Sequence, residues 1–112
     1  MNKIILTLGL LFSMITMNGA IKIDRIEPTD WFVGMKNPSL QLMVYGHDIG
    51  AATVTTDYAG VRIDSVVCLD SKNYLLVYLN IADAKPGIMT LNFKQGGATK
   101  KVKYTLKQRD MA

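Results

Sequence analysis

The chain has 112 residues, of which 49% are hydrophobic and 20% are charged. This balance indicates one globular domain with a modest core and excludes an intrinsically disordered chain. The formal net charge of +4 at pH 7 is too small to indicate binding to nucleic acid.

The first predicted element, residues 1–20, has the features of a secretory signal peptide. Lys3 supplies a positive start, residues 4–15 are almost wholly apolar, and the small residues Gly19 and Ala20 follow. A membrane-spanning anchor would need about 20 apolar residues. Three polar residues interrupt the run too early for that: Ser13, Thr16 and Asn18. We therefore expect a secreted or periplasmic mature protein that makes no membrane contact after cleavage.

Beyond residue 20, short apolar or alternating runs alternate with turn residues at spacings of about 8 to 12, which predicts a β-sandwich and not βαβ units. We expect seven strands, over residues 21–27, 39–45, 52–58, 61–69, 74–81, 88–93 and 100–106. No later segment of ten or more residues shows sustained helical periodicity, so the predicted class is all-β.

Three of these strands allow predictions about side-chain direction. Positions 21, 23 and 25 should share one face of the first strand. Apolar residues occupy both faces of 39–45, which predicts a strand that is covered on both sides. In 88–93, the odd-numbered positions should face away from the even-numbered ones. Residues 95–97, Gln-Gly-Gly, predict a tight hairpin into the last strand.

The segment between the first two strands, residues 28–38, is predicted to be an irregular loop. Prolines at its ends disfavour helix, and a central glycine permits backbone angles that other residues resist. Trp31, Phe32 and Met35 place large apolar side chains on this loop. Their side chains either plug the core or contact another domain, or form a platform for carbohydrate. These three residues are the candidate site for carbohydrate or domain-interface contact.

The sequence predicts neither a catalytic constellation nor a metal site, and no cofactor is expected. Side-chain hydrolysis needs convergent groups. Glu27 is the only glutamate, and we interpret Asp24 and Asp30 as strand-end and turn residues. His47 is the only histidine, whereas zinc needs three or four ligands, so we interpret it as a loop residue. Cys68 has no partner for an internal disulfide and is expected to pack as a small apolar residue in a strand.

Cations gather near the C-terminus, where positions 101, 103, 107 and 109 share one face if the strand is regular. Lysines that block pairing along an exposed edge strand would explain this pattern, and a surface for an anionic partner is the alternative. The polar residues 108–112 are interpreted as the start of a linker.

Several runs in this chain match a known family in order and in spacing. They are EPTDWFVGMKNPSLQLMVYG at 27–46, HDIG at 47–50, NYL at 73–75, KPG at 85–87 and YTLK at 104–107. Together they resemble the N-terminal domain of secreted cyclomaltodextrinases and neopullulanases, members of the α-amylase family. The resemblance covers nearly all of residues 22–110. It implies an immunoglobulin-like β-sandwich over residues 21–107, placed before a catalytic (β/α)8 barrel.

The resemblance also implies a role. In that family the domain helps to shape substrate access or the subunit interface, while the catalytic aspartate and glutamate reside in the barrel. The sequence stops where the barrel should begin, so no catalytic residue is carried over and the chain itself is expected not to be an enzyme. The positions that map onto the family are Trp31, Gly34 and Met35 in the loop motif, and Asn73 and Tyr74 in the strand motif.

The implied function is therefore a noncatalytic N-terminal accessory domain of an exported α-glucan-degrading glycoside hydrolase. Its expected partner is an α-amylase-type barrel in cis, with α-glucan or cyclodextrin as a further ligand. Two alternatives stay open: a stand-alone carbohydrate-binding module, and a secreted β-sandwich that mediates protein contacts.

Overall fold

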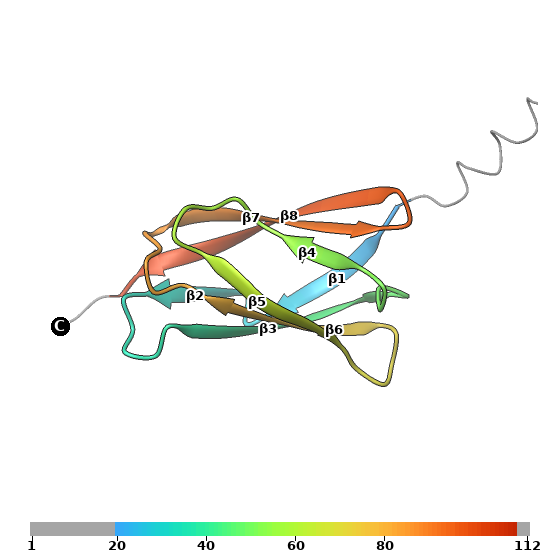
Figure 1. Ribbon diagram of the computed structural model, residues 1–112, viewed down its shortest axis with the longest axis horizontal. Coiled ribbons are helices and arrows are strands. Elements are labelled where there is room, and N and C mark those ends of the chain that lie inside the picture. Colours follow the sequence, from blue (N-terminus) through green and yellow to red (C-terminus); the bar gives the residue numbers. More distant parts are fainter. Residues whose placement is uncertain (1–19, 110–112) are drawn as a thin grey trace, which may run out of the picture.

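The computed structural model describes residues 20–109, and within this range it contains eight β-strands in two four-stranded sheets. The strands are β1 (Lys22–Glu27), β2 (Asp30–Val33), β3 (Ser39–His47), β4 (Thr53–Thr55), β5 (Arg62–Cys68), β6 (Tyr74–Asn80), β7 (Gly87–Gln95) and β8 (Ala98–Gln108). Sheet A has the order β1-β3-β6-β5 and sheet B the order β2-β8-β7-β4. The sheets form two layers (Figure 1), which confirms the predicted all-β sandwich.

Residues 1–19 of the expected signal peptide lie outside the described residues. Within residues 20–109, no helix is long and apolar enough to cross a bilayer.

Sheet A is built around the antiparallel pair β3 and β6. Successive side chains of a strand point to opposite faces, so alternate residues meet sheet B. The buried residues of this pair are Leu40, Leu42, Val44, Leu75, Val77 and Leu79. The residues between them on β3 include Met43 and Tyr45, which are half-buried on the outer face. The inner face of β3 is covered as predicted, but the prediction that both faces are covered is wrong for the outer face, where Gln41 is exposed and Met43 and Tyr45 are only half-buried.

Sheet B is built around the hairpin of β7 and β8. Its two-residue loop, Gly96 and Gly97, has φ angles of 56° and 91°. Two positive φ angles match the right-handed twist of the flanking strands, and they favour glycine. The odd-numbered residues Met89, Leu91 and Phe93 are fully buried, so both the alternation and the hairpin are as predicted.

The chain passes from sheet A to sheet B between β1 and β2. β1 pairs with β3, whereas β2 runs parallel to the end of β8, with Asp30 opposite Thr105. The buried hydroxyl of Tyr104 donates a hydrogen bond of 2.8 Å to the carbonyl of Pro28 at the crossing. This bond ties the connection between the sheets to β8.

Several predictions from the sequence are wrong in detail. Asp30–Val33 is a strand and not part of a loop, because it pairs with the distant C-terminal strand. A register shift in β1 between Ile23 and Arg25 turns Ile26 inward in place of Arg25. Of the strand predicted over 52–58, only Thr53–Thr55 pairs with β7.

Two single residues also differ from expectation. His47 ends β3 and is not in a loop. Cys68 is in a strand as expected, but it is exposed and not packed, because β5 is an edge strand with β6 as its only partner in sheet A.

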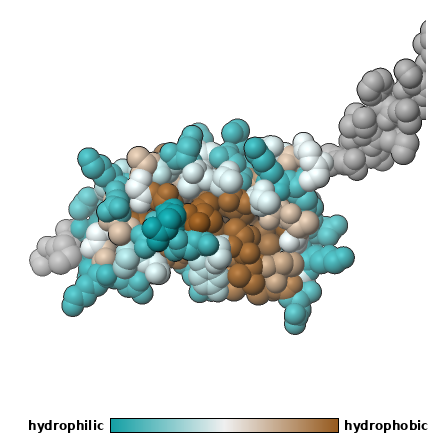
Figure 2. Space-filling model, in the orientation of Figure 1, coloured by the Kyte–Doolittle hydropathy of each residue, from teal (hydrophilic) through white to brown (hydrophobic). Residues whose placement is uncertain are grey.

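The two sheets meet unevenly along the side where β4 and β5 lie. β5 contributes the half-buried Ile63 and Val66, which contact the core, and Val67, which is 41% exposed. Figure 2 shows hydrophobic surface gathered in the middle of this side of the molecule, with polar side chains around it. Hydrophobic side chains therefore reach the molecular surface on this side.

Candidate functional site

The candidate residues Trp31 and Phe32 lie on opposite faces of β2. Trp31 is half-buried and packs against the hydrophobic core, while Phe32 is 36% exposed on the outer face of sheet B. Their ring centroids are 6.2 Å apart. The structure thus separates two adjacent side chains that the sequence suggested would act together: Trp31 fills the core, and Phe32 is available for contact.

Phe32 belongs to a small surface at the end of sheet B where the described chain leaves the sandwich. It lies opposite Lys107 in the parallel pairing, and the Lys107 amine is 5.7 Å from the centre of the phenyl ring. The same amine lies 3.2 Å from a carboxylate oxygen of Asp30. On the other side of β8, Ile88 is 61% exposed opposite Thr105. We call Phe32, Ile88 and Lys107 the exit surface.

Met35, the third candidate residue, follows Gly34 in the turn after β2. Gly34 has a φ of 79°, in the left-handed region that favours glycine. Met35 is half-buried, and it is not part of the core cluster.

Ile88 was missed as a site residue because alternation predicts its direction but not whether another segment covers it.

A second apolar surface covers the outer face of sheet A, and the sequence analysis did not name it as a site. Its centre is a row of cross-strand neighbours, Met43 on β3, Leu76 on β6 and Val67 on β5. Tyrosines flank this row: Tyr45, Tyr74 and Tyr78, all of them half-buried. We call these six residues the sheet A outer face. The sequence indicates this surface only indirectly, because β3 and β6 carry apolar residues at both their inward and their outward positions.

Two of the three tyrosine rings on this surface are in contact with each other. The centroids of Tyr45 and Tyr74 are 4.8 Å apart with an interplanar angle of 46°. The guanidinium carbon of Arg25 lies 4.7 Å from the centre of the Tyr45 ring, and Arg25 is also paired with Glu27 at 3.4 Å. The surface is therefore aromatic and nearly neutral in charge.

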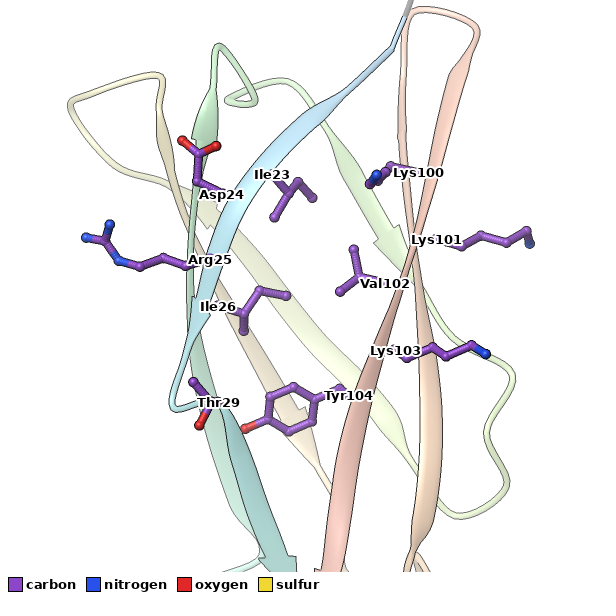
Figure 3. Close-up of a pocket in the computed structure, with 10 residues that line it drawn as sticks. All are labelled: Ile23, Asp24, Arg25, Ile26, Thr29, Lys100, Lys101, Val102, Lys103 and Tyr104. Atoms are coloured by element: carbon purple, nitrogen blue, oxygen red, sulfur yellow. The ribbon is translucent and has the colours of Figure 1, made fainter.

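A groove of about 450 Å³ lies between β1 and β8, on the other edge of the sandwich. Figure 3 shows Ile23, Ile26, Val102 and Tyr104 pointing into the space between the two strands, while Lys101 and Lys103 point away from it. The groove thus has an apolar floor and a basic rim on the side of β8.

The ion pairs among the described residues are separate from one another and do not converge on one site. The imidazole of His47 lies 3.0 Å from the carboxylate of Asp24, and Arg62 holds Asp64 at 2.7 Å. Burial, more than the charge of Asp30, raises the pKa of the Tyr104 phenol well above its ordinary value. Within residues 20–109, no group of three or more possible metal ligands is found.

These geometries offer candidate contact surfaces. The family model described as "Cyclomaltodextrinase, N-terminal" matches residues 25–110, which include all strands from β2 to β8.

Proposed function

We propose, because this chain belongs to the family of cyclomaltodextrinase N-terminal domains, that it is the noncatalytic accessory domain of an exported enzyme that degrades α-glucans. Its physical role is to pack against an α-amylase-type catalytic barrel and thereby narrow or extend the substrate cleft, or to form part of the subunit interface. A rigid sandwich suits this role, because a fixed wall beside a cleft excludes substrates by shape without taking part in the chemistry.

The observation that carries this proposal is the position of the exit surface. β8 ends at Gln108, which lies opposite Val33 of β2. In Figure 1, β2, the start of β7 and the end of β8 lie together at the end of the sandwich from which the chain runs toward its C-terminus. A barrel attached beyond Arg109 reaches the exposed Phe32 and Ile88 directly, without a long linker.

The chemistry of the exit surface also suits an interface between domains. Burying a phenylalanine or isoleucine side chain that was exposed contributes about 1.5–3 kcal/mol at most, and both side chains here are already partly covered. Lys107 supplies a cation at the rim. Interfaces between domains of one chain combine such apolar contacts with polar groups at their edges.

The sheet A outer face favours a second candidate, a carbohydrate-binding module. Three tyrosines line the outer face of sheet A, with Gln41 opposite Tyr78 on the neighbouring strand and Asn80 two residues further along β6. Aromatic rings offer apolar faces to sugar rings, and side-chain amides offer hydrogen bonds to hydroxyl groups. The partner of this face would be a neutral α-glucan.

The first test is to read the coding sequence that follows the codon for Ala112. An α-amylase barrel in frame supports the accessory-domain proposal. The barrel should then be expressed separately and titrated with this domain by calorimetry. We expect the double variant F32A/I88A to weaken association at least tenfold, and the control V67A, an exposed residue on the other sheet, to change it less than twofold.

Titration with maltooligosaccharide separates the two candidates. The carbohydrate-binding candidate predicts saturable binding that is lost in Y45A/Y74A and kept in F32A/I88A. If the domain binds neither the barrel nor the oligosaccharide, both candidates are wrong. If V67A weakens association with the barrel as much as F32A/I88A, the exit surface is not the contact.

A further inference from the structure

The groove between β1 and β8 combines an apolar floor with an unpaired strand edge. Within the described residues, β8 pairs with β7 from Ala98 to Leu106, but β2 covers its other side only from Thr105 to Gln108. Ala98–Tyr104 therefore has a neighbouring strand on one side only. β1 pairs with β3 and belongs to the opposite layer, so it does not fill the gap.

The hairpin determines which backbone groups face this open edge. Its loop is Gly96-Gly97, so the flanking residues Gln95 and Ala98 form the first hydrogen-bonded pair. Such pairs alternate with pairs that do not exchange hydrogen bonds. It follows that the N–H and C=O groups of Thr99, Lys101 and Lys103 point away from β7, toward the groove edge.

The side chains of the groove alternate in the same way. Ile23 and Val102 on its floor are only partly covered, whereas Ile26 and Tyr104 below them are buried. In Figure 3, Lys101 and Lys103 extend from the opposite side of β8. A strand placed along this edge would thus meet apolar groups with its inward side chains and lysines with its outward ones.

The charge along this edge is strongly positive. Lys100, Lys101 and Lys103 make no ion pair with any carboxylate in residues 20–109, although the amine of Lys101 donates a hydrogen bond of 3.1 Å to Asn92. Among residues 20–109, the only carboxylate that lines the groove is Asp24, which is paired with His47. An incoming segment with acidic outward side chains would be attracted.

We propose that the free edge of β8 binds an extended segment of a separate protein, in which apolar and acidic residues alternate. The segment adds a strand to sheet B beside Thr99–Lys103 and places its apolar side chains over Ile23 and Val102. Main-chain hydrogen bonds and alternate side-chain pockets are the two elements of recognition by strand addition. This inference goes beyond the proposed accessory role and does not depend on it.

Other occupants fit this edge less well. A second copy of the chain would bring the same lysines against each other, since lysines on an edge strand oppose its pairing with an identical edge. A polyanionic glycan could pair with the lysines, but it would leave the apolar floor and the backbone N–H groups without partners. An acidic, alternating peptide satisfies all three features at once.

The test uses a fluorescein-labelled peptide of alternating valine and glutamate, long enough to span Ala98–Tyr104, titrated against the full chain by fluorescence anisotropy. We expect saturable binding that weakens with added salt, because contacts between exposed charges are screened. A peptide of alternating valine and lysine should not bind. A valine and glutamate peptide with prolines at alternate positions lacks the backbone N–H groups that would donate hydrogen bonds to β8. It should bind at least tenfold more weakly than the peptide without proline.

Two variants locate the site. K101E/K103E should weaken binding of the acidic peptide at least tenfold, while the control K94E, on β7 and outside the groove, should change it less than twofold. Circular dichroism confirms that the variants fold. Amide hydrogen exchange measured by NMR should slow at Thr99, Lys101 and Lys103 when the peptide is bound.

Several results would overturn the proposal. No binding of the acidic peptide at millimolar concentration would exclude it. Equal binding of the charge-reversed peptide would exclude recognition by charge. Binding without slower exchange at these three amides would show a merely electrostatic contact and refute strand addition. Association of the free chain with itself through this edge would identify a second copy as the occupant instead.

Discussion

Trp31 and Phe32 allow a direct test of how the sandwich uses its aromatic residues, because adjacent side chains of one strand face opposite environments. We expect W31A to lower the free energy of unfolding by about 3 kcal/mol and F32A by about 1 kcal/mol or less. The two variants remove side chains of the same class from the same backbone segment, so each serves as the control of the other.

The magnitudes follow from what each side chain contacts. Covering about two-thirds to nine-tenths of a tryptophan of ~250 Å² at ~25 cal/mol/Å² contributes about 4 to 6 kcal/mol. The expected loss is smaller than this upper estimate because the unfolded chain is partly compact. Trp31 packs against the core, so its removal also leaves a cavity. Phe32 contacts its neighbours across the outer face, where a cross-strand pair contributes about 0.2–1 kcal/mol and solvent fills the space.

The assay is urea unfolding of the isolated chain followed by circular dichroism, since W31A removes the only tryptophan and with it the fluorescent probe. The urea midpoint should shift while the slope of the transition stays constant. Equal costs for the two variants, or a cost of W31A below about 1 kcal/mol, would refute the assignment of Trp31 to the core and Phe32 to the surface.

Four further outcomes are expected. Burial, and secondly the charge of Asp30, raise the pKa of the Tyr104 phenol. As the pH rises the unfolded chain therefore loses this proton before the folded chain does, so the free energy of unfolding should fall by up to about 1.4 kcal/mol per pH unit above about pH 10. Urea titrations at several pH values should find this decline absent in Y104F. A methyl group on Gly60 would overlap a backbone carbonyl oxygen, whereas a methyl group on Gly97 would have open space at a similar positive φ. Thermal melts should therefore show that G60A lowers the free energy of unfolding by about 2 kcal/mol more than G97A does. The purified chain should release no reducing sugar from cyclodextrin, starch or pullulan above a mock-purified control, because it lacks a convergent pair of carboxylates. Intact-mass measurement of exported material should show cleavage near Ala20, and recovery of the uncleaved chain in membranes would contradict this.

The parts of the fold that depend on local pattern could be predicted from the sequence. Alternation over 88–93 and the glycine pair at the hairpin indicated β7, β8 and their turn, because strand period and turn geometry depend on neighbouring residues alone. Apolar residues on both faces of 39–45 located the strand, but they did not show that its outer face stays partly exposed.

What depends on distant pairing could not be predicted in this way. β2 is four residues long and lies between a proline and a glycine, so it resembles a loop until β8 is placed beside it. The register shift in β1 leaves no mark in the pattern, yet it decides that Ile26 and not Arg25 faces the core.

The candidate surfaces were harder to predict than the strands. Trp31 was grouped with Phe32 because large apolar side chains on a supposed loop suggest contact, and only the strand assignment separates their directions. The groove beside β8 arises where β2 stops short, which is a property of the assembled sheet. The lysines of β8 predicted an exposed edge strand, and β8 is an edge only over Ala98–Tyr104, because β2 pairs with its last residues.

The pairing of β2 with the last residues of β8 has a consequence for the order of events during synthesis. Tyr104 reaches Pro28 across 76 residues, and the parallel pairs of β2 lie still nearer the end of the chain. Sheet B therefore cannot be completed until Thr105–Gln108 have left the ribosomal tunnel, since contacts between such distant residues form late. Until that moment sheet B lacks its parallel strand pairing, and the unfinished sandwich stays accessible to chaperones.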